Sequence, residues 1–213
     1  MQFPMESGGV RYDLIASGDF APAATLVAEV FARDEPLAVA TGQTREELTA
    51  MLSLTGPSAL AEQLSIGAAS DGRTVGVAFA TAFTWLPPDE AVAASPNYAP
   101  IGALLEELEA EFGARPREEL ERCVHVHMLA VDRAHRDRGI GRELLRVCLG
   151  NARARGMIAA VSDATNPASR RTFEAAGFTA IGQAHYADFA FEGEKPFAGI
   201  ATADHTALMF CTL

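Results

Sequence analysis

Short stretches in the first half of the chain alternate between hydrophobic and polar residues with the two-residue period of a strand. Residues 10–15, 65–69 and 74–84 follow this pattern. The last two flank Asp71-Gly72, a dipeptide typical of two-residue hairpin turns. The pattern therefore predicts one early strand followed by an antiparallel hairpin.

The second half of the chain carries further segments of strand character. An apolar run at residues 124–131 comes first, and a shorter one follows at residues 157–161. Residues 178–191 and 205–213 also read as strands. Together with the earlier segments, these predict a central sheet of about seven strands.

Hydrophobic residues recur at helical spacing between these strands. Residues 21–33 predict a helix with Asp19 as its cap and Pro22 in its first turn. Helices are also expected at residues 141–155 and 167–176, each directly after a strand. This order is typical of a sheet with helices packed on its faces.

Two shorter helices are predicted after the first one. Thr44 can cap a helix at residues 45–54, and Glu47, three positions later, is its reciprocal partner. The pair Gly56-Pro57 predicts the end of that helix. A separate helix then follows at residues 58–64.

Residues 86–121 differ from the rest because five prolines interrupt them, and only residues 101–112 have helical periodicity. Long connections of this kind are commonly functional. We interpret residues 86–121 as a helical insertion before the strand at 124–131, lying over a single domain that spans residues 1–213. The order of elements predicts the α/β (α+β) class, with a mixed sheet and helices on both faces.

Composition and charge narrow the class of ligand. The 213 residues are 49% hydrophobic, which fits a chain with one sizeable core. Lys and Arg number 17 against 28 Asp and Glu, so the molecule should repel nucleic acid and anionic membranes and accept cationic small molecules. Nine of the sixteen arginines nevertheless lie between Arg133 and Arg171, which concentrates positive charge in one segment.

The cysteines and the first residues indicate the compartment. Cys123, Cys148 and Cys211 lie in apolar contexts without C-x-x-C spacing, which favours reduced thiols over disulfides. The first nine residues lack the basic and apolar regions of a secretion signal, and no apolar run approaches the ~20 residues of a membrane span. We therefore expect a cytoplasmic protein without a membrane partner.

Candidate chemistry begins at the turn after the strand at residues 124–131. The turn reads Arg136-Asp137-Arg138-Gly139-Ile140-Gly141-Arg142 and leads directly into a helix. The first amides of a helix lack intrahelical partners and carry positive partial charge, so they bind anions. Glycines with positive φ would let the backbone approach a phosphate, and the arginines could reach the same group. The turn predicts a pyrophosphate site, although a plain tight turn with solvated arginines has the same composition.

A second helix start lies nearby in the chain. Asn166 and Ser169 begin the helix predicted at residues 167–176, after the strand at 157–161. Two helix N-termini could thus flank one anion. The turn lacks the further glycine of G-x-G-x-x-G, and the chain has no G-x-x-x-x-G-K-[ST] motif, so neither standard nucleotide fingerprint fits.

The segment VHMLAVDRAHRDRGIGRELL resembles the acyl-CoA motif of the GNAT N-acetyltransferase superfamily, [QR]-x-x-G-x-[GA], and NPASRRTFEAAGF resembles its second motif. The resemblance implies an acetyl-CoA-binding core at residues 124–178, with the strands at 124–131 and 157–161 splayed apart. It also implies pantetheine pairing along Leu129, Ala130 and Val131. Further expected contacts are Arg136, Asp137, Arg138, Gly139, Ile140, Gly141, Arg142, Asn166 and Ser169.

Asp34-Glu35-Pro36-Leu37 looks like a signature of the arylalkylamine (dopamine-type) N-acetyltransferase branch, and KPFAGIATADHTALMFCTL looks like the closing strand of that branch. On its own the acidic pair is an ordinary helix end. The resemblance makes Glu35 the general base, with Thr165 and Ser169 in the places of two serines of the branch. It implies acetyl transfer to a small primary amine by a monomer or homodimer.

Some residues leave alternatives open. Phe173 stands where many GNAT enzymes have a tyrosine acid, and it also fits the hydrophobic pair of a helix stop with Phe178. His125 and His127 share a sheet face, but a metal pair would need more ligands than the sequence shows, so no metal is expected. The acceptor could instead be a polyamine, an aminoglycoside or a protein N-terminus, and a non-catalytic acyl-CoA-binding module also fits.

Overall fold

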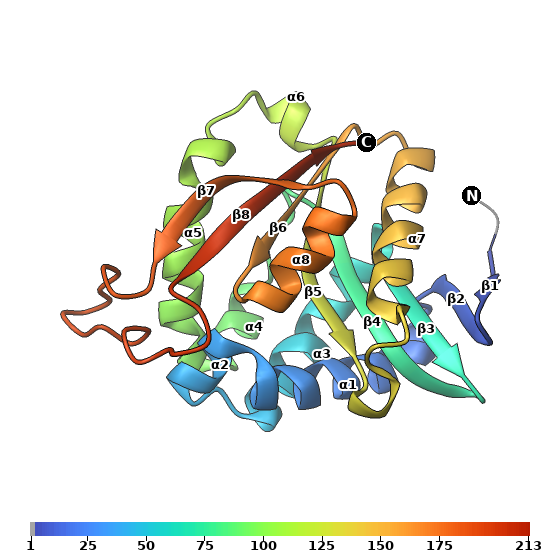
Figure 1. Cartoon of the computed structure of the whole chain (residues 1–213), viewed down its shortest axis with the longest axis horizontal. Helices are drawn as coiled ribbons and strands as arrows, with labels where there is room; N and C mark the ends of the chain where they lie inside the picture. The colour runs from blue at the N-terminus through green and yellow to red at the C-terminus, as the bar shows by residue number, and fades with distance from the viewer. Residues whose placement is uncertain (1–2) are drawn as a thin grey trace.

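A computed structural model describes residues 3–213 of the chain (Figure 1). Its centre is an eight-stranded sheet in the order β1-β2-β3-β4-β5-β6-β8-β7. Neighbours β5 and β6 are parallel, and the other neighbouring pairs are antiparallel. The strands are β1 Met5–Ser7, β2 Val10–Leu14, β3 Ile66–Ser70, β4 Arg73–Ala82, β5 Cys123–Val131, β6 Ala159–Ala164, β7 Thr179–His185 and β8 His205–Thr212.

The strands agree with the hydrophobic pattern, with one addition at the edge and one strand that is shorter than predicted. The strand predicted at residues 178–191 ends at His185, because Tyr186 and Phe189 pack with Phe197 in an apolar cluster outside the sheet. β1 is three residues long and pairs with β2, and the sequence pattern does not predict it. The β3–β4 hairpin turns at Asp71 and Gly72, which have φ values of 50° and 73°. Positive φ at both turn positions matches the twist of a hairpin, so this prediction is confirmed.

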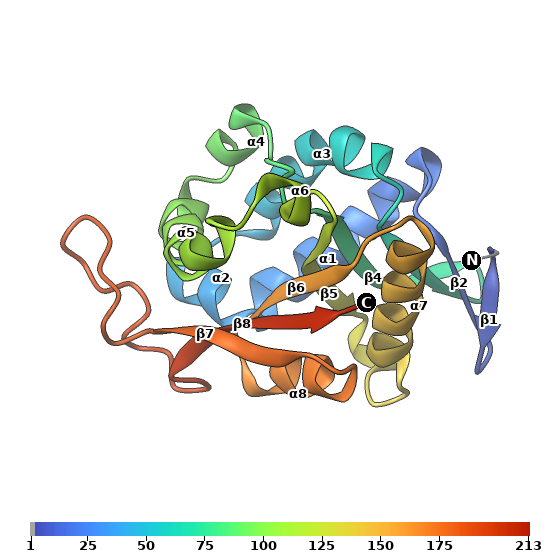
Figure 2. The ribbon, with the colours of Figure 1, turned by 90° about the horizontal axis from the view of Figure 1, so that it is seen from above.

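Helices cover both faces of the sheet. Figure 2 shows α3, α4, α5 and α6 on one side and α7 and α8 on the other. The helices are α1 Phe20–Asp34, α2 Pro36–Thr41, α3 Arg45–Ala61, α4 Asp89–Ala93, α5 Ala99–Gly113, α6 Arg117–Leu120, α7 Ile140–Ala154 and α8 Pro167–Ala175, with short 3-10 turns η1 Ser17–Asp19, η2 Pro96–Tyr98 and η3 Arg133–His135. The expected α/β class with a mixed sheet is confirmed.

Helix α3 corrects the predicted break at Gly56-Pro57. The helix runs through both residues, and Pro57 lies on its exposed side, where water can bond the carbonyl that loses its partner. Gly56 is buried, and a Cβ added to it would lie 2.3 Å from the Phe20 ring. This glycine therefore permits close packing of α1 against α3. The capping box of Thr44 and Glu47 forms as predicted.

Helix α1 starts differently from the prediction. Asp19 precedes the helix, but its side chain makes no capping hydrogen bond, because η1 runs directly into α1 and leaves Asp19 in a helical conformation. A helix cap needs an extended residue before the first turn. Pro22 does lie in the first turn of α1, as expected.

Helices α4, α5 and α6 form the segment that the sequence marked as an insertion. The longest of them, α5, packs against β7 and β8. Its Leu108 and Phe112 share an apolar cluster with Val161 and Leu208 of the sheet. This segment is therefore part of the core packing on that face, and one side of α5 is held against the strands.

Cys123, Cys148 and Cys211 are buried free thiols, as predicted. Burial raises the pKa of both Cys123 and Cys148 to about 12 and that of Cys211 to about 11. Among residues 3–213, no helix is long and apolar enough to cross a bilayer.

Candidate active site

Strands β5 and β6 diverge at the centre of the sheet (Figure 1). They pair only through Cys123–Ala159, Val124–Ala160 and His125–Val161 among the described residues. On its other edge, β5 stays paired with β4 as far as Val131. The edge of β5 that faces β6 at Leu129, Ala130 and Val131 is therefore open to an extended ligand, and the predicted splay is confirmed.

The turn after β5 prepares the start of α7. Gly139 has a φ of 79° and is the residue before the helix, and Asp137 also has a positive φ, of 61°. Gly141 lies inside α7 with helical backbone, so the expectation of positive φ at both glycines is wrong for Gly141. The Glu143 amide donates to the Gly139 carbonyl at 3.0 Å as the first helical bond. The amides before it therefore point out of the helix end.

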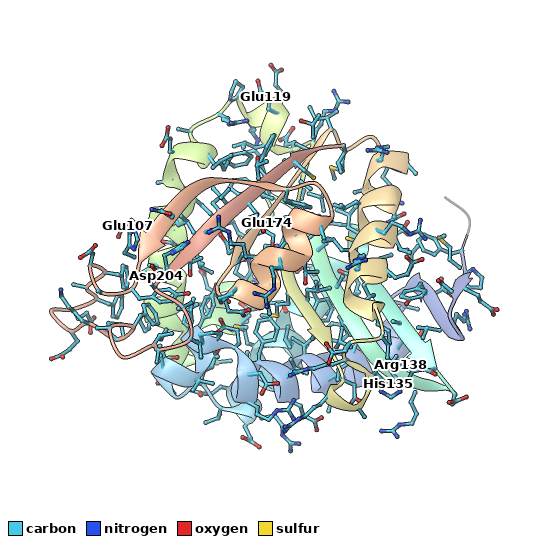
Figure 3. The ribbon with its side chains drawn as sticks, viewed as in Figure 1. Glu107, Glu119, His135, Arg138, Glu174 and Asp204 are labelled. Atoms are coloured by element: carbon cyan, nitrogen blue, oxygen red, sulfur yellow. The ribbon has the colours of Figure 1, made fainter. Side chains whose placement is uncertain are left out.

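The side chains of this turn fall into two groups. Ile140 is buried in the core, and only its backbone remains available to a ligand. Arg138 and Arg142 are exposed, and Figure 3 shows Arg138 at the rim of the molecule. Arg136 bonds the Asp34 carboxylate at the end of α1. The turn thus offers backbone amides, one arginine that is already paired, and two arginines that have no ion-pair partner among residues 3–213.

The second helix start has the predicted cap. The Asn166 side chain accepts hydrogen bonds from the amides of Ala168 (3.0 Å) and Ser169 (2.9 Å). The Ser169 hydroxyl donates to the Asn166 carbonyl at 2.9 Å. Ser169 therefore has a structural partner in addition to its expected role.

One cavity of about 1200 Å³ joins these features. Among the predicted catalytic and acetyl-CoA-binding residues, those that line it are Glu35, Leu129, Val131, Arg136, Gly141, Thr165, Asn166 and Ser169. The lining does not include the other predicted residues, which are Ala130, Asp137, Arg138, Gly139, Ile140 and Arg142. Ala130 and Ile140 are buried in the core, and the other four lie on the exposed turn. Both helix starts therefore open onto one space together with Glu35.

Two adjacent carboxyl groups at the end of α1 have opposite environments. Hydrogen bonds from Arg33 and Arg136 lower the pKa of Asp34 to about 2. Burial raises the pKa of Glu35, although the Ala38 amide and the Thr165 hydroxyl partly oppose the shift. Glu35 Oε2 accepts from the Ala38 amide at 2.6 Å, whereas Oε1 is buried without a partner among the described residues. Of the two, Glu35 is the better proton acceptor, because its pKa is raised whereas that of Asp34 is lowered.

Thr165 connects Glu35 to a residue that sequence reasoning missed. The Tyr186 hydroxyl donates to the Thr165 carbonyl at 2.7 Å and lies 2.9 Å from the Thr206 hydroxyl. Tyr186 is almost fully buried, and burial raises its pKa. This bond fixes the end of β6 beside Glu35. No motif marks Tyr186, because its contacts join segments far apart in the chain.

The two histidines of β5 lie in the same cavity. Their ring centroids are 4.0 Å apart, as expected for residues on one face. His127 Nε2 lies 2.7 Å from the Thr81 hydroxyl, and burial lowers the pKa of His127 well below its usual value. His125 faces two carboxyl groups, from Glu109 on α5 and Asp163 on β6. Sequence reasoning did not single out either acid.

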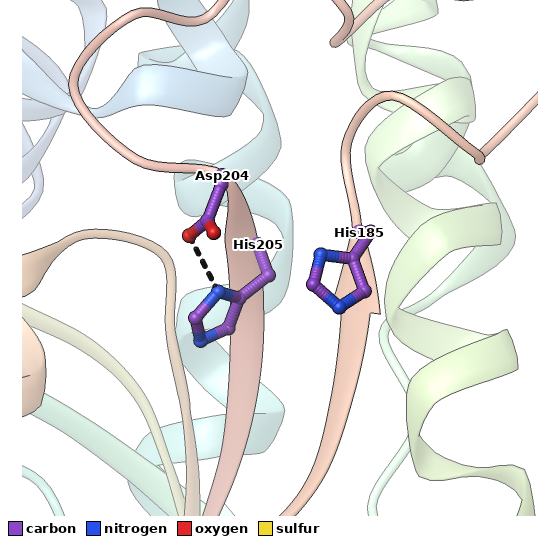
Figure 4. Close-up of side chains that lie close together, drawn as sticks. All are labelled: His185, Asp204 and His205. Atoms are coloured by element: carbon purple, nitrogen blue, oxygen red, sulfur yellow. Dashed lines mark hydrogen bonds and ion pairs between the residues drawn. The ribbon is translucent and has the colours of Figure 1, made fainter.

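Outside this cavity, His205 has surface partners. It lies opposite His185 at the ends of β7 and β8, and its Nδ1 is 2.6 Å from the Asp204 carboxylate (Figure 4). Its Nε2 is 3.2 Å from Arg170. His205 does not line the cavity described above.

Phe173 has the structural role that the sequence suggested. Its ring centroid is 5.1 Å from that of Phe178, and the Phe178 amide donates to the Phe173 carbonyl at 3.1 Å. Gly177 between them has a φ of 94°. These are the features of a Schellman helix stop. Phe173 is buried and supplies no proton.

Comparisons with known proteins agree with this arrangement. The model of the acetyltransferase (GNAT) family matches residues 26–178. Acetyltransferase Atu2258 of Agrobacterium fabrum (strain C58 / ATCC 33970) is 42% identical over 59 residues, which cover 28% of this chain and 43% of that protein. The chain thus matches less than half the length of this relative.

Solved structures are similar over nearly the whole chain. Arylalkylamine N-acetyltransferase 2 from Aedes aegypti has a TM-score of 0.78 at 23% identity, covering 95% of this chain and 98% of that one. The polyamine N-acetyltransferase of Drosophila melanogaster has a TM-score of 0.65 at 17% identity, covering 96% and 100%. At these identities the likeness concerns the fold.

The family in general uses acetyl-CoA as co-substrate and transfers its acetyl group to an amine. The family match spans well over half of the sequence and includes both β5 and the turn before α7. The chain therefore belongs to the acetyltransferase (GNAT) family and is an N-acetyltransferase.

Proposed function

We propose that this protein acetylates a small primary amine directly from acetyl-CoA, with Glu35 as the general base. The observation that carries the proposal is the position of Glu35 in the lining of the cavity onto which both helix starts open, with its Oε1 buried and without a partner among residues 3–213. A carboxylate in this position can accept the proton that an amine loses when it is acylated.

The residues on the donor side fit acetyl-CoA. The amides at the start of α7, which have no partner among the described residues, suit the pyrophosphate. At the start of α8, Asn166 already accepts from the amides of Ala168 and Ser169. A Cβ at Gly139 would meet no atom within 4 Å, so this glycine leaves open space beside the turn. The open edge of β5 suits an extended pantetheine arm. When bound, acetyl-CoA supplies an activated acetyl thioester.

Glu35 is suited to its role by its surroundings. Burial favours the neutral carboxyl, so the ionised form is a stronger base than an exposed glutamate. The bond from the Ala38 amide fixes Oε2, whereas Oε1 has no partner among residues 3–213. Asp34 cannot replace it, because two arginines hold its carboxylate ionised.

We assign Thr165 and Ser169 to orientation of the acetyl group and to assistance of the departing thiolate. Thr165 lies beside Glu35, and Ser169 stands at the start of α8. Ser169 already donates to the Asn166 carbonyl, so it would have to rotate its hydroxyl to assist a thiolate. A thiolate is a good leaving group and needs no strong acid, which agrees with Phe173, a residue that has no acidic proton to donate.

The acceptor side suits an amine with an apolar body of the arylalkylamine kind. Phe83, Trp85 and Tyr98 line the cavity and give it aromatic walls. The likeness to the arylalkylamine N-acetyltransferase of Aedes aegypti supports this choice. A polyamine acceptor is the second candidate, and the acidic groups around His125 favour it.

An amine panel tests the proposal. The purified protein is incubated with acetyl-CoA and 2-phenylethylamine, tryptamine, 1,4-diaminobutane, n-butylamine or a peptide N-terminus, and release of the coenzyme A thiol is measured. We expect transfer to small amines and none to the peptide. Absence of transfer to every amine, with coenzyme A still bound in calorimetry, would contradict the enzymatic proposal and favour a binding module.

A further inference from the structure

A buried cluster of charged side chains lies on the acceptor side of the cavity. It contains Glu109 from α5, His125 from β5 and Asp163 from β6, and all three line the cavity. His125 Nε2 is 3.0 Å from Asp163 Oδ2 and 3.8 Å from Glu109 Oε1. Polar side chains from three separate elements thus meet at one point.

The cluster has an unmet hydrogen-bonding capacity. The Asp163 side chain is only 8% exposed, and its Oδ1 is buried without a partner among the described residues. A buried carboxylate oxygen without a donor is costly, because it has lost its water. The cavity in front of Asp163 is the place from which a donor could come.

The charge of the cluster points to a cation as that donor. Glu109 and Asp163 both face His125, and Glu106 adds a third acidic side chain to the cavity wall. Although burial opposes the charged ring, Asp163 and Glu109 raise the pKa of His125. Burial raises the pKa of Glu109 to about 8, and the charge of Asp163 and a hydrogen bond to it add to the effect. Near neutral pH, Glu109 therefore keeps a proton that it can donate to Asp163 and that a bound cation could replace.

The neighbouring aromatic groups fit the same ligand. Tyr98 lines the same cavity, and burial, followed by the charges of Asp163 and Glu109, raises its pKa to about 12. The Phe83 ring stacks on His125 at 5.7 Å between centroids. Carboxylates bordered by aromatic rings are a favourable environment for an organic ammonium or guanidinium group.

The distance from Glu35 sets the length of the ligand. Asp163 and Thr165 are two residues apart at the end of β6 and both line the cavity. Two residues of extended chain span roughly 7 Å. Because Thr165 adjoins Glu35, an amine at Glu35 could place a second positive group at Asp163 through a short aliphatic spacer.

We propose that Glu109, His125 and Asp163 form a second subsite that binds a cationic group at the far end of the acceptor. The preferred acceptors are then short diamines and guanidino-alkylamines, so the subsite favours the second, polyamine candidate over an arylalkylamine. This inference rests on the proposed acetylation at Glu35 and specifies its substrate class. The subsite sets specificity, and the proton transfer remains with Glu35.

Paired acceptors of equal length test the subsite. With acetyl-CoA saturating, kcat/KM is measured for 1,4-diaminobutane and n-butylamine, and the ratio of the two is compared across variants. We expect a ratio well above one for the native protein. Glu109→Gln and Asp163→Asn should each lower this ratio roughly ten- to a hundredfold, the value of one charged hydrogen bond. Glu107→Gln, an exposed position on the same helix (Figure 3), should leave it unchanged.

Several outcomes would overturn the subsite. A native ratio near one would do so, as would an equal loss with both amines in Glu109→Gln and Asp163→Asn. Inhibition by Zn²⁺ that these variants relieve, with the amine ratio unaltered, would mark a metal site instead. If neither amine is acetylated, the proposed function fails. Calorimetric titration of 1,4-diaminobutane into the protein with coenzyme A then tests the subsite by itself. Binding that Glu109→Gln weakens would support the subsite, and no binding would refute it.

Discussion

The cavity has a donor side, where acetyl-CoA is expected, and an acceptor side, where the amine is expected, and different chemical groups line the two sides. On the donor side, the turn at residues 136–142 is mostly exposed, and backbone amides at the start of α7 supply its chemistry. On the acceptor side, Glu35, Glu109 and Asp163 are side chains from three elements, held in a largely apolar space. The chemistry of the donor side depends on backbone conformation, whereas the chemistry of the acceptor side depends on the burial of its side chains.

This difference determines how each side responds to substitution. Backbone amides persist when a nearby side chain is changed, so the donor turn should tolerate loss of exposed arginines but not a change in its glycine conformation. A buried carboxyl group has no substitute, because burial itself sets its pKa. The predictions below test this contrast, from the largest expected effect to the smallest.

Removal of the buried base should have the largest effect. We expect Glu35→Gln to lower kcat by roughly 10²- to 10⁴-fold, the usual contribution of a general base. Affinity for acetyl-CoA should change little, because Glu35 lies on the acceptor side. Steady-state kinetics with calorimetry of coenzyme A separates the two. Asp34→Asn is the matched control, and an equal fall in kcat there would remove the distinction between the two acids.

Disruption of the donor turn comes next. Gly139→Asp places a charged side chain at a φ of 79° beside the phosphate-binding amides. Strain and repulsion together should weaken coenzyme A binding roughly ten- to a hundredfold. Gly139→Ala carries the strain without the charge and should have a smaller effect. Equal affinity of Gly139→Asp and the native protein in calorimetry would show that this turn does not hold the phosphates.

The pH dependence should reveal the environment of Glu35. Its pKa is raised by burial, so the ionised base is lost as pH falls through a value above that of an ordinary glutamate. Below that value, kcat at saturating amine should fall about tenfold for each pH unit. Asp34, with its pKa of about 2, stays ionised throughout this range. A pH profile of kcat checks this, and the same acid limb in Glu35→Gln would contradict the assignment.

The exposed cations of the turn should matter least. Arg138→Gln should weaken coenzyme A binding by roughly threefold at low salt, because exposed charges are screened by solvent. Added salt should reduce the difference further. Binding measured at two ionic strengths checks this. A loss as large as that of Gly139→Asp would mean that side chains, and not amides, hold the phosphates.

The same contrast explains what could be read from the sequence. The donor site is local, because strand, glycine turn and helix follow one another in the chain, so its elements and the capping box of Asn166 and Ser169 could be predicted. Glu35 became the candidate base only through the family resemblance. Glu109, Asp163 and Tyr186 carry no local signal, since their meaning arises only where α5, β6 and β7 meet.

Local rules also failed where tertiary packing prevailed. Gly56 and Pro57 are strong helix-ending residues, yet α3 continues because its buried face packs on Phe20. The side chain of Asp19 is a good cap by composition, but η1 places it in a helical conformation. At both places the contacts of α1 outweigh the preference of the individual residue.

The burial of the three cysteines has a practical consequence for measuring this enzyme. Thiols with pKa values raised to between about 11 and about 12 are almost entirely protonated at assay pH, and only thiolates react quickly with disulfide reagents. A colorimetric reagent added to the folded protein should therefore register coenzyme A released by turnover, with little background from the catalyst itself.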